Sequence, residues 1–485
     1  MNNNIIIGRK YEQKLINACC NSDKAELIAI YGRRRVGTTY LVKSMFNDEF
    51  AFSFTGLYDV SRQVMLEQFR KKLERYSGWQ ISRFKDWYEA FDMLRNYLES
   101  LHSDKLIVFL DELPWMDTRK SNFLSAFSFF WNDWASTVNN MKIIVCGSAT
   151  TWMMSNVIGD KGGLYGRVSR AIYLAPFSLR ESEEFLKRVK GMDVSHRQTM
   201  EIYMTMGGIP YYLNMMEKGV PIDSCIDRLF FAHGAPLRGE FEFLFRSLFS
   251  DSKIYRMVIE TLSSKMKGMT RQELMSAMKI GEGGKLSIVL DNLLACDFIR
   301  RYTSIGKSER DAIYQLTDLF SLFHLRYVDK NSGQDEHFWS NNRGEGNRRA
   351  WSGYAFEQVC LHHLPQIKKA LGISGILCNA YSWISKPLVS EDGSQRKGAK
   401  IDLLIDRADN VINLCEMKYA SEEYTIDAEY EKRLCERSRL FKEVTKTKKS
   451  VLITFVTTFG VYQNAHTGLV QNEVTMDDLF GKYQH

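Results

Sequence analysis

The sequence predicts an α/β protein made of several domains in series. Between about residues 25 and 175, short apolar runs alternate with longer segments of helical period, which is typical of a parallel sheet. A glycine-containing turn follows the first apolar run directly, and a second alternation of strands and helices begins after residue 350. At about 150 residues per domain, the chain of 485 residues indicates about three domains.

Composition narrows the class of protein. Hydrophobic residues make up 45% and charged residues 25%, which favours folded domains over disordered or fibrous chains. The net charge of +7 permits a nucleic-acid partner without requiring one. The nine cysteines include no Cys-x-x-Cys pair. The first residues lack the basic flank and the long apolar core of a signal peptide. The apolar runs are shorter than the ~18 residues of a membrane span. We therefore expect a cytoplasmic protein with no membrane partner.

The first domain, residues 1–175, is expected to hold the parallel sheet. After Pro176 the strand signals give way to helix-forming stretches up to about residue 240, which indicates a small helical domain. The predicted strands of the sheet are Leu27–Tyr31, Phe50–Phe54, Leu106–Leu110, Ile143–Cys146 and Ala171–Leu174.

Residues 241–330 show helices followed by a hairpin. A capping box runs from Thr270 to Glu273, and an amphipathic stretch precedes two strand-like runs, 298–302 and 312–316. Three helices and a two-stranded wing resemble a winged helix, although the pattern suits a small helical packing domain equally well. Residues 331–349 are polar and predicted to be a linker, and residues 350–485 form the last α/β domain.

The first strand leads into a candidate phosphate-binding loop. Glycines let the backbone wrap a phosphate, the following helix offers its N-terminal N–H groups, and a Ser or Thr hydroxyl ligates Mg²⁺. Thr39 holds that hydroxyl position, whereas Thr38 stands where the P-loop pattern requires Lys. The loop consists of Gly32, Arg33, Arg34, Arg35, Val36, Gly37, Thr38 and Thr39.

Other polar residues at strand ends fit the same site. Asp111 follows an apolar strand and is expected to help hold Mg²⁺, while Glu112 would orient or deprotonate the attacking water. Ser148 follows a neighbouring strand and would sense the γ-phosphate, and Arg167 would reach the nucleotide of a neighbouring subunit. A strand-end hydrogen bond for Ser148 and a surface charge for Arg167 are equally good interpretations.

At these residues the chain resembles the AAA-like P-loop ATPases of archaea and bacteria. The resemblance spans about residues 5–330 and implies that Gly8 and Arg9 lie near the adenine, that residues 207–213 belong to a helical lid, and that hydrolysis occurs between subunits of a homo-oligomer. Thr38 departs from the family pattern, so we expect weakened ATP binding and almost no hydrolysis. The matching segments are Ile6–Arg9, Gly32–Thr39, Leu110–Glu112, Cys146–Ser148, Leu164–Arg167 and Gly207–Leu213.

A second set of charged residues lies in the last domain. Asp402 is in one predicted strand, and Glu416 and Lys418 alternate on one side of the next, so a hairpin would bring the two carboxylates together. They would bind Mg²⁺ or Mn²⁺, with Glu357 of the preceding helix completing the metal shell and Lys418 stabilising the phosphate. An exposed ion pair between Glu416 and Lys418 is the plainer interpretation.

The order of these elements over about residues 350–460 resembles the PD-(D/E)XK nuclease superfamily. With both resemblances, the sequence predicts a P-loop NTPase parallel sheet, a helical lid, a winged helix domain and a C-terminal α/β nuclease-like domain. The predicted function is to couple nucleotide state to DNA binding or metal-dependent DNA cleavage. The alternatives are a nucleotide-dependent signalling switch or transcription regulator with an inactive nuclease fold, and a scaffold without either activity.

Overall fold

In the computed structural model, the described residues group into two compact units. The first contains residues 1–176, 209–211 and 247–250, and the second contains residues 177–208, 212–246 and 251–485. The domain boundaries predicted at residues 240, 330 and 349 all lie inside the second unit, and they remain predictions. The residues described are 5–118, 120–159, 163–249, 251–281, 283–303, 305, 311–331, 335–342, 344, 346–385, 388–389, 395–396 and 398–482.

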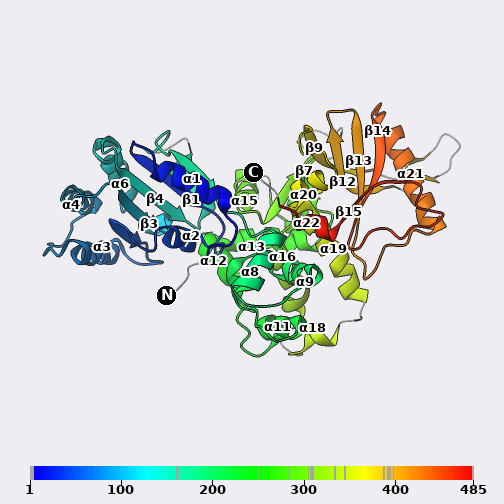
Figure 1. Cartoon of the computed structure of the whole chain (residues 1–485), viewed down its shortest axis with the longest axis horizontal. Helices are drawn as coiled ribbons and strands as arrows, with labels where there is room; N and C mark the ends of the chain where they lie inside the picture. Colours follow the sequence, from blue (N-terminus) through cyan, green and yellow to red (C-terminus); the bar gives the residue numbers. More distant parts are fainter. Residues whose placement is uncertain are drawn as a thin grey trace. The chain divides into compact units, whose positions relative to one another are not determined.

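A five-stranded parallel sheet forms the centre of the first unit, in the order β2-β3-β4-β1-β5. Figure 1 shows β1, β3 and β4 side by side in the blue-to-cyan part of the chain. Because the strands are parallel, their carboxyl ends share one edge, which gathers the residues that follow β1, β3 and β4. The strands are β1 (Glu26–Tyr31), β2 (Phe52–Thr55), β3 (Leu106–Asp111), β4 (Met141–Gly147) and β5 (Arg170–Tyr173), so the predicted parallel sheet is confirmed.

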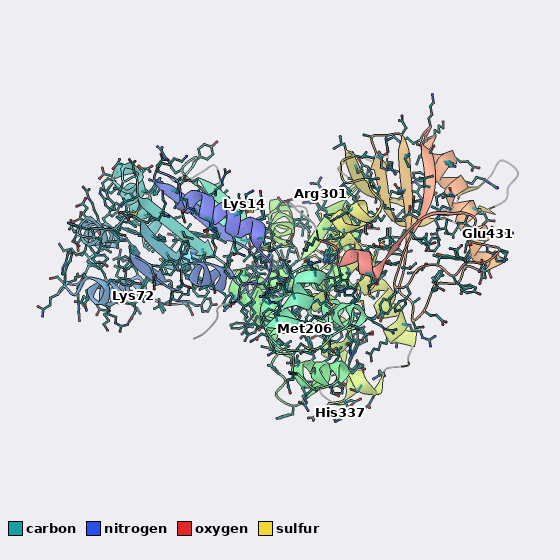
Figure 2. The ribbon with its side chains drawn as sticks, in the orientation of Figure 1. Lys14, Lys72, Met206, Arg301, His337 and Glu431 are labelled. Atoms are coloured by element: carbon teal, nitrogen blue, oxygen red, sulfur yellow. The ribbon has the colours of Figure 1, made fainter. Side chains whose placement is uncertain are left out.

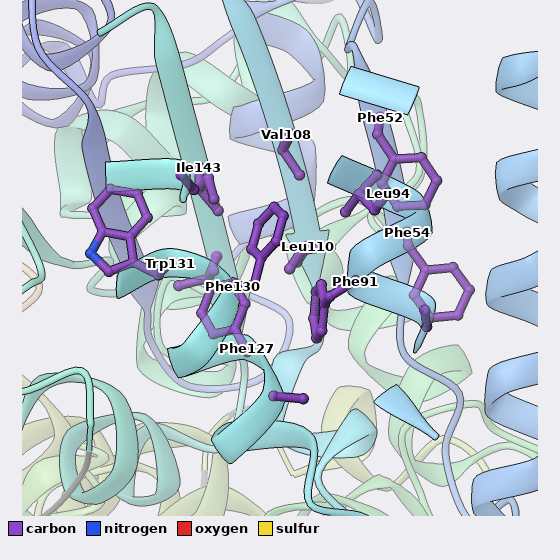
Figure 3. Close-up of a cluster of buried hydrophobic side chains, with 14 of the residues drawn as sticks. Phe52, Phe54, Phe91, Leu94, Val108, Leu110, Phe127, Phe130, Trp131 and Ile143 are labelled. Atoms are coloured by element: carbon purple, nitrogen blue, oxygen red, sulfur yellow. The ribbon is translucent and has the colours of Figure 1, made fainter. Parts of the chain in front are cut away.

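Helices on this sheet enclose an aromatic core. Phe69 contacts the rings of Phe52, Phe54 and Trp87, and Phe91 stacks on Phe130 at 5.1 Å between ring centres. Figure 3 shows Phe52, Phe54, Phe91 and Phe130 near side chains of β3 and β4, such as Leu110 and Ile143. The helices are α1 (Lys10–Cys20), α2 (Thr38–Met45), α3 (Arg62–Ser77), α4 (Trp87–Glu99), α5 (Leu113–Met116), α6 (Phe123–Asp133) and α7 (Thr150–Met153).

The chain from residue 177 to 341 is mostly helical. Ser178, Ser195 and Thr270 each close a capping box, so the predicted box at Thr270 and Glu273 is confirmed. The helices are α8 (Leu179–Arg188), α9 (His196–Met206), α10 (Pro210–Leu213), α11 (Ile222–Ile226), α12 (Glu240–Leu248), α13 (Ser252–Ser264), α14 (Arg271–Met278), α15 (Gly284–Ala295), α16 (Leu319–Phe323), α17 (Asp329–Asn331) and α18 (Phe338–Asn341).

Helices α13 to α15 are accompanied by a small antiparallel sheet with the order β6-β8-β7. Its strands are β6 (Met269–Thr270), β7 (Ile299–Tyr302) and β8 (Ile313–Leu316), which agree with the predicted hairpin. The stretch expected to be a linker contains packed residues: the Trp339 N–H donates to the buried Asp227 carboxylate at 2.7 Å, and Arg348 pairs with Asp223 at 2.6 Å. These contacts hold the described part of residues 331–349 against α11.

A mixed five-stranded sheet forms the C-terminal part, in the order β15-β14-β13-β12-β9. Strands β9 and β13 run antiparallel to β12, and β14 and β15 run parallel to β13. The described residues contain no helix long and apolar enough to cross a membrane. The larger elements are α19 (Gly346–His362), β9 (Cys378–Ile384), β12 (Lys400–Arg407), β13 (Val411–Lys418), α21 (Ala428–Thr445), β14 (Ser450–Thr457) and β15 (Val470–Thr475); the short ones are α20 (Leu364–Ala370), β10 (Leu388–Val389), β11 (Gln395–Arg396) and α22 (Met476–Leu479).

A buried histidine joins two helices of the second unit. The Nε2 atom of His363 accepts a hydrogen bond from the Leu179 N–H at 3.0 Å, and its Nδ1 lies 2.8 Å from the Val359 carbonyl oxygen. Burial lowers the pKa of His363 to about 4, so its imidazole is neutral in the folded protein.

This histidine makes stability sensitive to acid. The unfolded chain binds a proton near pH 6.5 and the folded chain only near pH 4, so stability is lost as pH falls between these values. We expect wild type to lose about 3 kcal/mol more than His363→Gln on moving from pH 7.5 to 4, measured by urea unfolding. Parallel losses in the two proteins would contradict this.

Candidate functional site

Two glycines shape the turn between β1 and α2. A Cβ atom built on Gly32 would lie 2.4 Å from the carbonyl oxygen of Leu174, the residue that follows β5. Only glycine therefore fits there without displacing the backbone at Leu174. Gly37 has φ +93° and a built Cβ atom would meet nothing within 4 Å. The glycines therefore fix a tight backbone turn that opens at the N-terminus of α2, where backbone N–H groups favour an anion.

The three arginines of this turn lie in different surroundings. Arg33 is buried, with 2% of its surface exposed. The Arg34 guanidinium lies 5.8 Å from the ring centre of Trp115, and that of Arg35 lies 3.8 Å from the ring centre of Tyr211. Contact with aromatic rings orients Arg34 and Arg35. This agrees with a phosphate cradle formed by the backbone of the turn and not by these side chains.

The residue after Thr38 contacts the end of the neighbouring strand. The Thr39 hydroxyl lies 3.1 and 2.9 Å from the two carboxylate oxygens of Asp111. Asp111 is 3% exposed, and burial raises its pKa, while the Thr39 hydrogen bond opposes that rise. The structure thus brings together a hydroxyl and a carboxylate, the oxygen donors that Mg²⁺ prefers, so these residues fit a magnesium ion.

Glu112 and Ser148 form a second contact beside the first. The Ser148 backbone N–H and hydroxyl both donate to Oε2 of Glu112, at 3.3 and 2.9 Å. Burial and the charge of Asp111 raise the pKa of Glu112, whose backbone adopts a left-handed conformation at φ +49°. Ser148 therefore orients the Glu112 carboxylate, a partner that the sequence pattern did not indicate.

Three predicted site residues, Gly8, Arg9 and Arg167, lie away from this contact network. Arg9 is 6% exposed, and its Nη2 donates to the Ala175 carbonyl oxygen at 2.6 Å; the Gly8 carbonyl accepts from Gln13 at 2.9 Å. Both residues are thereby fixed near the chain that follows β5. Arg167 is exposed on the turn after Leu164, a position open to a neighbouring molecule.

Residues 7–216 match the family of ATPase domains found predominantly in Archaea. The matched segment includes the Gly32–Thr39 turn, Asp111, Glu112 and Ser148, and it ends before the C-terminal sheet. Thr38 occupies the first position of α2 in this segment, where the P-loop pattern has Lys.

Similarity over longer stretches is weaker. An uncharacterized protein of Methanocaldococcus jannaschii is 26% identical over 369 residues, which cover 75% of this chain and 78% of that protein. The Walker-type ATPase of Pyrococcus abyssi is 17% identical, with a TM-score of 0.48 over 66% of this chain and 96% of that one. The Aeropyrum pernix ORC2 protein is 14% identical, with a TM-score of 0.42 over 67% and 94%.

The second predicted site lies on the β12–β13 hairpin. Leu403 pairs with Cys415 in the antiparallel register, so Asp402 and Glu416 follow as the next positions of the two strands. Glu357 projects from α19, which packs against β13. Burial and the negative charge of Asp402 raise the pKa of Glu357 to about 7, so these two carboxylates lie within electrostatic reach of each other.

Cations of the same chain engage the carboxylates. Lys400 forms an ion pair with Asp402, and Arg437 forms one with Glu416, which also accepts a hydrogen bond from the Tyr430 hydroxyl at 2.8 Å. Lys418 lies 3.6 Å from Glu416, as its strand spacing predicted. Within the described residues, no group of three or more His, Cys, Asp or Glu side chains is arranged to hold a metal ion. The three-carboxylate metal shell therefore stays a prediction.

Sequence reasoning missed three residues near these carboxylates. Tyr430 and Arg437 belong to α21, where their spacing of seven places them on one helix face. Arg300 belongs to β7, far away in sequence, and its Nε donates to Gln315 at 2.8 Å. Burial lowers the pKa of Arg300, while the charges of Asp402 and Glu357 act against this. The helical spacing of Tyr430 and Arg437 could have indicated that both side chains lie on one face of α21. No local pattern points to Arg300.

The adjacent carboxylates of Asp111 and Glu112 predict a conflict between stability and ligand binding, because burial raises the pKa of both. Replacement Asp111→Asn removes a buried charge next to Glu112 and keeps a group that can bond Thr39. We expect the free energy of unfolding of the ligand-free protein to rise by about 1 kcal/mol, measured by urea unfolding at pH 7. The exposed carboxylate change Asp92→Asn serves as the control, and a loss of stability in Asp111→Asn would contradict the prediction.

Proposed function

We propose that this chain is an ATP-binding protein of the AAA-like type, whose nucleotide state controls DNA binding or cleavage by its C-terminal part. The observation that supports nucleotide binding most strongly is the contact between Thr39 and Asp111 beside the Gly32 turn, within a matched ATPase domain. The backbone of Gly32–Thr39 would hold the phosphates, and Thr39 and Asp111 would hold Mg²⁺, which neutralises phosphate charge.

Hydrolysis is proposed to be impaired. The P-loop lysine normally places a positive charge on the β- and γ-phosphates, and Thr38 supplies none. Glu112 is half-buried, Ser148 fixes its Oε2 atom, and in the proposed mechanism it would orient a water molecule. The site would thus bind ATP more weakly than an intact P-loop would and leave it largely unhydrolysed.

Assembly and DNA contact are part of the same proposal. The exposed Arg167 is suited to contact the nucleotide of a second copy in a homo-oligomer. Helices α13 to α15 and the β7–β8 hairpin follow the order of elements in a winged helix domain. This domain would contact DNA. Residues 176–240 would correspond to the helical lid that the resemblance implies.

For the C-terminal part, we propose a nuclease-like site in which Glu357 and Asp402 bind a divalent cation. Two carboxylates together with substrate phosphates are a common way to hold Mg²⁺ or Mn²⁺. Lys418 would stabilise the charge that develops on the scissile phosphate. Glu416 would join the metal only after leaving Arg437, because that ion pair occupies its carboxylate.

The pairing of Glu416 with Arg437 also supports a second candidate function. If the ion pair persists, the C-terminal part would bind DNA or protein without cleaving it. Together with Thr38, this favours a nucleotide-dependent signalling switch or transcription regulator.

Restoring the missing charge tests the nucleotide site. We expect Thr38→Lys to raise the rate of phosphate release from ATP and Mg²⁺ by at least about tenfold over wild type, because a single well-placed cation strongly stabilises phosphoryl transfer. Phosphate release is followed by a coupled colorimetric assay. The double variant Thr38→Lys/Asp111→Asn should lose the gain, and no gain in Thr38→Lys would refute the assignment of the loop.

Plasmid cleavage separates the two candidate functions. In Mg²⁺ or Mn²⁺, a nuclease would convert supercoiled plasmid to nicked or linear DNA, and Asp402→Ala and Lys418→Ala should each reduce the rate about 100-fold or more. The exposed Glu423→Ala variant is the matched control. DNA binding without cleavage in wild type would reject the nuclease and support the switch.

A further inference from the structure

A basic pocket lies in the ATPase domain outside the site described above. It has a volume of about 210 Å³ and opens between α2, the end of β2 and α3. Its lining, drawn wholly from described residues, includes four cationic side chains and no carboxylate. The polar lining residues on which the argument depends are Lys43, Ser53, Thr55, Lys71, Lys72 and Arg75.

The spacing of residues on α3 creates this basic surface. Lys71, Lys72 and Arg75 follow Gln68 at intervals of three, four and seven, which places all four on one face of the helix. The opposite face packs into the core through Phe69 and other buried residues. The packing of α3 therefore does not require the basic face. Lys72, on this face of α3, is labelled in Figure 2.

Charges around the pocket leave a positive excess. Lys43 lies 3.3 Å from Asp48 and Lys71 lies 3.7 Å from Glu67, but both pairs are largely exposed to water and hold their partners weakly. Glu67 is also engaged by Arg70 at 2.8 Å. The local field is therefore positive and attracts an anion.

The pocket borders the position of the proposed magnesium ion. Thr55, at the end of β2, pairs with Asp111 in the sheet register, and Lys43 lies one helical turn after Thr39 on α2. The charge of Lys43 and a hydrogen bond from Thr55 both lower the pKa of Asp111. An anion in the pocket would therefore act on the same carboxylate that faces the nucleotide turn.

We propose that this pocket is a second anion site that binds phosphate groups. Its volume is below the about 300–1,000 Å³ of typical small-molecule pockets, so it suits one or two phosphates better than a whole nucleotide. The four cations match the charge of phosphate and can donate hydrogen bonds to its oxygens. The phosphates would come from a nucleic-acid backbone or from a nucleotide.

Titration calorimetry with inorganic pyrophosphate, in EDTA and at constant ionic strength, tests the proposal. Wild type should bind pyrophosphate, and Lys71→Gln/Lys72→Gln should bind it about tenfold more weakly or worse. Lys14→Gln/Lys85→Gln removes the same charge from exposed positions of α1 and of the turn before α4, and should bind within about twofold of wild type. Lys43→Gln, on a different element, should weaken binding as well.

Competition then identifies the source of the phosphates. Displacement of pyrophosphate by a 20-base-pair duplex assigns the pocket to a nucleic-acid backbone, and displacement by ATP alone assigns it to a nucleotide. The proposal is overturned if wild type does not bind pyrophosphate, if both double variants lose binding equally, or if neither competitor displaces it.

Discussion

The hydrogen bonds from the Thr39 hydroxyl to the Asp111 carboxylate connect the turn after β1 to the end of β3. These hydrogen bonds can form only because the parallel sheet brings the carboxyl ends of β1, β3 and β4 to one edge. The close approach of Gly32 to the Leu174 carbonyl fixes the turn from the other side. A buried carboxylate held in this way is costly without a cation, so the geometry is most readily explained by a site built for one.

A different balance of charge holds the C-terminal hairpin. Asp402 and Glu416 are each neutralised by a cation from their own chain, Lys400 and Arg437. Such internal pairs offset part of the cost of burying the Glu416 carboxylate, and a divalent cation would have to compete with them. The two candidate sites therefore differ: Asp111 is held by hydroxyl groups, whereas Asp402 and Glu416 are paired with cationic side chains.

Local sequence patterns predicted most of the elements and few of the contacts between them. The five apolar runs of the first sheet, the hairpin of β12 and β13 and the capping box at Thr270 each carry a signal within a few residues. The sequence placed Glu112 and Ser148 in one site, but the hydrogen bond between them could not be predicted, because Ser148 lies 36 residues later in the chain, after β4. Arg300 and the basic pocket depend equally on segments that only the tertiary fold brings together.

The most direct test of the account is the thermal stability of wild-type protein with ATP and Mg²⁺. A ligand that binds only the folded state at 100 times its Kd adds about 2.7 kcal/mol of stability, which is readily seen as a rise in Tm. We predict a rise in wild type that is absent in Thr39→Val, whose side chain lacks the hydroxyl. An unchanged Tm in wild type at millimolar ATP and Mg²⁺ would contradict nucleotide binding and leave the scaffold interpretation.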